Sequence, residues 1–404
     1  MKKLYLNVAF MYLSLLSAYG QVKTVPISSD TSSYQSRKLK VDEVNLVSAY
    51  YNQDGNNSAV TGGIGTEKLN DIANTIDVQL SRFTKTGKKD AFSFELGVDH
   101  YTSASSDKID PSTISSASSN DTRVYPSLNW TRSNEETGNS FGFTGSYSTE
   151  FDYQSVGAAF NLTRQSKNKN TQFDFKAQAF LDQWTVILPI ELRTPKLGNK
   201  HDEQYGTAPR NSFSASFALS QVINQRFQVS INIEPSYQHG LLATKYQRDY
   251  FTDGSLKAET LPDKRYKLPI GVRMNYFLDD RFIIRAFYRY YLDNWGIKAH
   301  TAELEIPVKI NSFFSISPFY RYSNQQGTRY FTAYGQHQVG DQYFTSDYDL
   351  STLNSDFYGA GIRLSPPKGV FGWQRLNSAE LRYGHYARST GLASNIVSLN
   401  LKFK

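Results

Sequence analysis

From Val41 onward, apolar and polar residues alternate along most of the chain. The last segment is typical, because Val397, Leu399, Leu401 and Phe403 interleave with polar residues. Successive side chains of a strand point to opposite faces of a sheet, so this pattern predicts strands with one apolar and one polar face. No stretch of comparable helical period follows the N-terminal apolar run. The chain is therefore predicted to be all-β.

The alternating segments number 16, and this count is even, as single-chain bacterial outer-membrane barrels require. They begin near Val44, Ile72, Phe92, Val124, Phe141, Val156, Phe173, Phe213, Phe227, Tyr266, Phe282, Lys298, Phe314, Phe357, Ala379 and Ala393. We predict a transmembrane antiparallel β-barrel of about 16 strands, with bounds of about 14 and 18, because each segment carries a weak signal.

The lengths of the connections support the same fold. In outer-membrane barrels, short periplasmic turns alternate with longer extracellular loops. Tight turns are expected at residues 223–226, 278–281 and 310–313, all on even-numbered connections. The long polar stretches fall on odd-numbered connections, at residues 52–68, 103–122, 182–211, 239–265 and 324–355. A soluble β-sandwich, the alternative fold, gives no reason for this sorting.

The N-terminus predicts export. Lys2 and Lys3 precede a short apolar run, and small residues follow it, so residues 1–20 are expected to be a signal peptide cleaved after Gly20. A retained membrane anchor fits less well, because the apolar run is short. Residues 21–42 are then a periplasmic tail and residues 43–404 the barrel, which places the protein in the cell outer membrane with lipids as its surroundings.

Composition removes several function classes. The chain has no cysteine, which excludes disulfides, thiol catalysis, Cys-ligated metals and a lipid anchor on cysteine. Its net charge is +7 without a basic cluster, so we expect no nucleic-acid partner.

The polar register of the later strands is predicted to line the lumen. An Arg or Lys on the lipid face costs about 2–4 kcal/mol at the membrane midplane, so charged residues should point inward. The candidate lumen-lining residues are Arg285, Arg289, Glu303, Glu305, Arg321, Arg363, Glu380 and Arg382. Two interpretations stay open: a charged constriction that selects solutes, or an ion-paired plug that braces the wall and closes the lumen.

The polar loop after the first strand holds a second candidate site. Its candidate residues are Asp54, Asn56, Asn57, Gly62, Gly63 and Gly65. The oxygen ligands could suit calcium, but the EF-hand spacing is missing. The glycines lack the GxxxxGK[ST] spacing of a phosphate loop. A Gly-rich reversal over or into the barrel mouth is favoured, and we expect neither a metal nor a cofactor.

An enzyme is not expected. The six histidines are scattered, and an outer-membrane hydrolase around His100 or His385 would need a serine and an acid brought together. The predicted function is a pore or channel for small polar solutes. The alternatives are a non-conducting barrel that scaffolds lipoprotein partners and, third, an outer-membrane hydrolase.

Two runs resemble a known family. QDGNNSAVTGGIGTEKL (Gln53–Leu69) and YTSASSDKID (Tyr101–Asp110) are similar to an uncharacterised family of outer-membrane β-barrels of the Bacteroidetes kind, catalogued as a domain of unknown function. The genes of that family often lie near those of a thioredoxin-like lipoprotein and a flavin transferase. The resemblance therefore implies a lipoprotein redox partner, with a role in extracellular or flavin-linked electron transfer, and it carries over no catalytic residue.

Overall fold

The computed structural model describes residues 37–102, 120–193 and 204–404. The expected signal peptide, most of the expected tail and part of the Tyr101–Asp110 run lie outside the described residues. In the ranges that are described, no helix combines the length and apolar character needed to cross a membrane.

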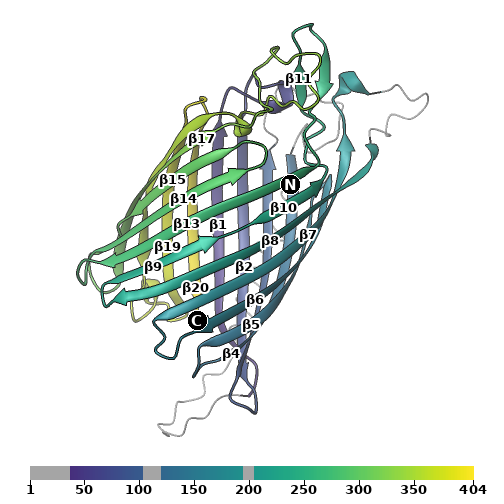
Figure 1. The fold of residues 1–404 in the computed structure, drawn as a ribbon. Helices are drawn as coiled ribbons and strands as arrows, with labels where there is room; N and C mark the ends of the chain where they lie inside the picture. Colours follow the sequence, from purple (N-terminus) through teal and green to yellow (C-terminus); the bar gives the residue numbers. More distant parts are fainter. Residues whose placement is uncertain (1–36, 103–119, 194–203) are drawn as a thin grey trace, which may run out of the picture. The chain divides into compact units, whose positions relative to one another are not determined.

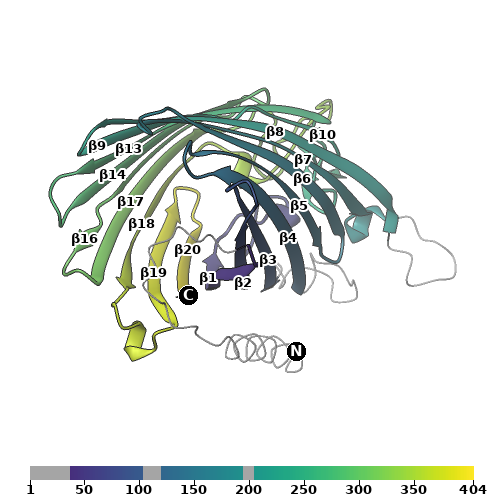
Figure 2. The same cartoon turned by 90° about the horizontal axis from the view of Figure 1, so that it is seen from below.

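One antiparallel sheet closes on itself, because the first strand pairs with both the second and the last (Figures 1 and 2). Its segments are β1 (Lys40–Asp54), β2 (Leu69–Phe83), β3 (Lys89–Thr102), β4 (Asn120–Asn134), β5 (Asn139–Thr149), β6 (Tyr153–Gln165), β7 (Thr171–Ile187), β8 (Gln204–Asn224), β9 (Phe227–Ile233), β10 (Ser236–Gly240), β13 (Lys264–Phe277), β14 (Ile283–Asp293), β15 (Lys298–Glu305), β16 (Val308–Lys309), β17 (Phe314–Gln326), β18 (Leu353–Leu364), β19 (Leu376–Arg388) and β20 (Ala393–Phe403).

Two of the barrel strands are each broken once. β9 and β10 both pair with β8 and β13, and the break between them lies at Glu234 and Pro235. β15 and β16 both pair with β17, and their break lies at Ile306 and Pro307. Each break contains a proline, which has no N–H to give to a ladder. The barrel therefore has 16 strands, which confirms the predicted fold and count.

The longer connections gather at one end of the barrel, called here the loop end, and the other is called the turn end. The loop-end segments include β11 (Arg248–Tyr250), β12 (Leu256–Ala258), η1 (Ala59–Thr61), η2 (Ile190–Leu192) and η3 (Tyr348–Leu350). β11 stands above the strands in Figure 1. At the turn end the connection from 365 to 375 carries η4 (Val370–Gly372) and is longer than the other turns.

One predicted connection was too long. β7 runs on to Ile187 and β8 starts at Gln204, so much of the polar stretch 182–211 is strand and not loop. The polar ends of these strands lack the alternation of apolar residues that marks the membrane-spanning segments. A prediction based on alternation therefore ends each strand too early.

The outer face of the barrel is apolar. Leu128, Val156 and Leu181 are each more than half exposed, on strands whose alternate residues are polar. The packed clusters lie at the ends instead: Val370, Leu376 and Phe403 are buried together at the turn end. An exposed apolar wall with a polar inner register is the arrangement that a barrel adopts in lipid.

Candidate functional site

The inner face can be identified from one ion-pair network. Arg382 on β19 donates to Glu305 on β15 at 3.3 Å, although β17 and β18 lie between these strands. Side chains from two strands that have two other strands between them can meet only on the concave side of a curved sheet. Because side chains alternate between faces, this contact assigns the whole register of charged residues on these strands to the lumen.

The structure brings six of the eight predicted lumen residues into ion pairs. Arg285 Nη1 lies 3.1 Å from Glu305, Arg382 Nη1 lies 3.3 Å from Glu380, and a longer pair joins Arg321 to Glu303 at 3.9 Å. The two others, Arg289 and Arg363, have no carboxylate within 4.0 Å among the described residues. Their registers, opposite Thr301 and Glu380, place them on the same inner face.

These arginines keep contact with solvent. The side chains of Arg285, Arg321 and Arg382 are 50%, 40% and 35% exposed. The guanidinium of Arg321 stacks on Phe357 at 4.7 Å, and that of Arg382 on Phe319 at 5.2 Å. Solvent screening weakens such pairs to about 1 kcal/mol or less each. The network thus orders side chains along one wall while leaving their charges facing the lumen.

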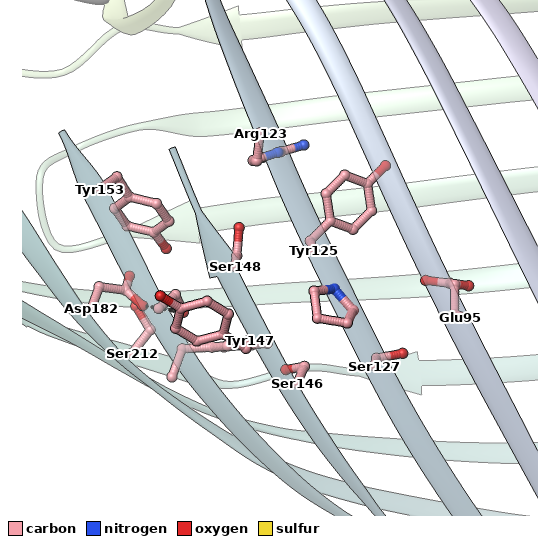
Figure 3. Close-up of a pocket in the computed structure, with 13 residues that line it drawn as sticks. Glu95, Arg123, Tyr125, Ser127, Ser146, Tyr147, Ser148, Tyr153, Asp182 and Ser212 are labelled. Carbon is pink, nitrogen blue, oxygen red and sulfur yellow. Dashed lines mark hydrogen bonds between the residues drawn. The ribbon is translucent and has the colours of Figure 1, made fainter. Parts of the chain in front are cut away.

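The wall formed by β3 to β8 is lined differently, mainly by hydroxyl groups. A cavity of about 380 Å³ lies against it, with Tyr125, Ser127, Ser146, Ser155 and Ser212 among its lining residues (Figure 3). The strand pattern alone did not single out this wall, because serine is neither charged nor a strong strand former. The run of serines at alternate positions is the signal that could have found it.

The charged residues of that cavity are held by neighbours. Arg123 donates to Asp99 at 2.7 Å and stacks on Tyr125. Asp182, only 5% exposed, accepts from Ser155 at 2.7 Å and lies 3.5 Å from Arg210. Glu95 lies on the same wall and has no cation within 4.0 Å in the described part of the chain.

A second cavity, of about 470 Å³, adjoins the first and shares Phe180 and Ser212 with it. Its lining crosses β7, β8, β10 and β13 and includes Lys176 and Lys267. The two cavities together make a continuous stretch of lumen wall rich in hydrogen-bond donors and acceptors.

The Gly-rich loop packs against other loops at the loop end. Gly62 and Gly63 have φ near +85°, and a Cβ on Gly62 would meet the Tyr250 ring at 2.7 Å. Asn57 donates to the Thr390 carbonyl at 2.5 Å, and Gly65 pairs with Asn57. Asp54 ends β1, and Asn56 belongs to the same loop. No group of three or more His, Asp or Glu able to hold a metal ion occurs among the described residues.

The loop end also buries acidic groups that the sequence did not mark. Glu259 is 2% exposed and accepts from the Thr345 hydroxyl and the Thr244 N–H, both at 2.5 Å. Burial raises the pKa of Glu259 to about 8. Burial, with the nearby Asp349 charge, likewise raises the pKa of Glu67 to about 7 and that of Asp347 to about 6.

The histidines considered for hydrolysis have simple partners. His100 Nδ1 lies 2.8 Å from the Thr122 hydroxyl, and His385 Nδ1 lies 2.9 Å from Asn395. A different histidine, His337, contacts Ser346 at 3.2 Å. His337 and Ser346 are 1% and 2% exposed, so this pair sits inside the packed loops and away from solvent.

The closed ring, its apolar outer face and its polar inner face define an outer-membrane type of β-barrel. The family model described as "Protein of unknown function (DUF3570)" matches residues 86–386, and the chain belongs to that family. The match includes the Tyr101–Asp110 run, and the Gln53–Leu69 run lies before it. No curated protein matches the chain.

Solved structures with a similar trace are distant in sequence. The siderophore receptor PirA from Acinetobacter baumannii is 10% identical, with 85% of this chain and 53% of that chain covered and a TM-score of 0.46. OpdK of Pseudomonas aeruginosa, solved with vanillate, is 8% identical, with 92% and 99% covered and a TM-score of 0.42. OccAB3 of A. baumannii is 10% identical, with 90% and 99% covered and a TM-score of 0.38. The chain spans about half the length of the siderophore receptor.

Proposed function

We propose that the barrel is a pore for small polar solutes in the outer membrane. The observation that carries the proposal is the lumen wall formed by β3 to β13, where two adjoining cavities of about 380 and 470 Å³ are lined by hydroxyl, amide and charged groups. Such a wall replaces part of the hydration of a polar solute and lowers the cost of entering the lumen.

The wall formed by β14 to β19 is suited to discriminate between solutes by their charge. Arg289 and Arg363 face the lumen without an ion-pair partner among the described residues, beside the paired arginines and glutamates. We expect this wall to set ion selectivity, with the ion pairs holding the side chains in place.

Single-channel conductance of the refolded full chain in a planar bilayer tests the pore. We expect steady current steps and a selectivity that shifts in Arg289→Ala. A silent bilayer, with folding confirmed in parallel by heat-modifiable migration in gels, would overturn the pore.

A second candidate is a non-conducting barrel that scaffolds lipoprotein partners, and the interlocked loops favour it. Arg248 bonds to the Val60 carbonyl at 2.8 Å and to Glu191 at 3.0 Å, which ties three loops together. Copurification of a lipoprotein with a silent barrel would support this candidate. The Bacteroidetes origin, the redox link and the absence of enzymatic activity stay predictions.

A further inference from the structure

Most lumen-facing arginines have a carboxylate partner, but two lysines of the larger cavity do not. Lys176 on β7 and Lys267 on β13 have no carboxylate within 4.0 Å among the described residues, whereas Arg210 and Arg265 nearby pair with Asp182 and Asp293. A cation in a partly enclosed wall cavity, with no carboxylate within ion-pair distance, is free to take an anion from the lumen.

The two lysines flank one trough. Lys176 stands opposite Ser216 of β8, and Lys267 opposite Ser236 of β10, so two strands separate them along the wall. Between them the cavity is lined by Gln178, Ser214 and Ser236, which make no side-chain hydrogen bond with any described residue. The trough therefore offers two positive charges and several uncommitted polar groups to one ligand.

The remaining lining limits what that ligand can be. Glu234 also lines the cavity and accepts from the Ser216 hydroxyl at 3.2 Å, so the lining carries a net charge of one positive. A dianion would be repelled by Glu234, while a monoanion balances the lining. Phe180 and Pro269 add apolar surface beside the polar groups. The adjoining cavity carries Glu95 and Asp182 against Arg123 alone, a net charge of one negative, which disfavours an anion there.

We propose that this trough binds the carboxylate of a small organic monoanion between Lys176 and Lys267, with the apolar body of the ligand against Phe180 and Pro269. The proposal deepens the pore function, on which it rests for the route of access, by naming the class of solute. Binding itself can be measured whether or not the barrel conducts.

Calorimetric titration of the full chain, folded in detergent at an ionic strength of about 0.1 M, tests the site with benzoate as the probe. Benzyl alcohol serves as the neutral isostere and inorganic phosphate as the multiply charged oxyanion. We expect saturable heat with benzoate and much weaker binding of the other two. Lys176→Gln and Lys267→Gln should each weaken benzoate by about tenfold, because one charged hydrogen bond contributes roughly 1.5–3 kcal/mol.

Lys88→Gln is the matched control, because it removes one positive charge from an exposed turn at the turn end, outside the trough. We expect its benzoate affinity to stay within about twofold of the parent, since salt screens charges beyond about 10 Å. Heat-modifiable migration verifies that every variant is folded. Absence of saturable heat, equal binding of benzyl alcohol, or an equal loss in Lys88→Gln would each overturn the site. None of these results depends on conductance, so a failed site and a failed pore are distinguishable.

Discussion

Replacing Glu259 by Gln should make the packed loops at the loop end less sensitive to pH. These loops, residues 55–68, 241–263 and 327–352, are called the loop cap. Glu259 sits inside it at 2% exposure, and Lys245 donates to its backbone carbonyl at 2.6 Å. The next residue after Glu259, Thr260, pairs with Phe344 as in a β-bridge, and this pairing joins two of the loops.

The sign of the effect follows from the raised pKa. The closed cap keeps Glu259 protonated up to a pKa of about 8, whereas an opened loop would ionise it near 4.5. The closed cap is therefore most stable below pH 4.5 and loses stability as the pH rises from there to about 8. At pH 7 the cost reaches about 3 kcal/mol at most, taking 1.36 kcal/mol for each pKa unit. The raised pKa values of Glu67 and Asp347 act in the same direction.

Glutamine keeps the shape but cannot ionise, and its amide oxygen can accept from the Thr244 N–H while its NH2 group donates to the Thr345 hydroxyl. Hydrogen exchange of peptides that cover residues 256–263 and 340–347, corrected for intrinsic rates, should therefore show up to about 100-fold more protection in Glu259→Gln at pH 7. At pH 4.5 the variant and the parent should agree. Glu136→Gln, in an exposed turn at the other end of the barrel, is the control. Equal pH dependence in Glu259→Gln and the parent would refute the reasoning.

Three further predictions concern other parts of the barrel. Glu305→Gln removes the carboxylate shared by two lumen arginines, so the reversal potential in a salt gradient should shift in the direction of greater anion selectivity. An unchanged reversal potential would contradict the placement of this network in the lumen. Gly62→Ala should destabilise the loop cap by roughly 1–3 kcal/mol, because the new Cβ meets the Tyr250 ring, and proteolysis of the loops should become faster. Gly254→Ala is the control: Gly254 has a similar positive φ but lies in open space, so its replacement should have the smaller effect. Phe403→Ala, at 5% exposure, should destabilise the turn-end cluster by about 3–5 kcal/mol, and an unchanged gel-shift temperature would argue against that packing.

The strand order was predictable because it depends on local chemistry. The alternation at Val397 to Phe403 and the turn residues at 278–281 are read within a few positions, and the closed barrel follows from their repetition and even number. The break at Pro235 was only partly predictable: proline has no N–H for a ladder, yet Pro269 and Pro318 lie inside unbroken strands. The alternation continues across it, which is why one strand was correctly predicted there.

The contents of the loops and of the trough were not predictable in the same way. Glu259 and Thr345 are far apart in sequence and look like ordinary polar loop residues, and only the folded loops bring them together. Similarly, the sequence predicts that Lys176 points inward, but only the strand register shows that Lys267 lines the same cavity. Contacts of this kind depend on shear and loop packing, which a single sequence does not display.

The pairing of charges divides the lumen into two functional walls. On β14 to β19, Glu303, Glu305 and Glu380 hold three of the five lumen arginines, which braces that wall. The other two, Arg289 and Arg363, have no carboxylate within 4.0 Å among the described residues and leave the wall with an excess of positive charge. On β7 to β13 the lysines stand without such partners and beside uncommitted hydroxyl groups. A wall braced by ion pairs resists rearrangement, while an unpaired wall can exchange solutes with the lumen. Solute recognition is therefore expected on the wall of β7 to β13, and variants of the arginine wall should alter ion selectivity more than solute affinity.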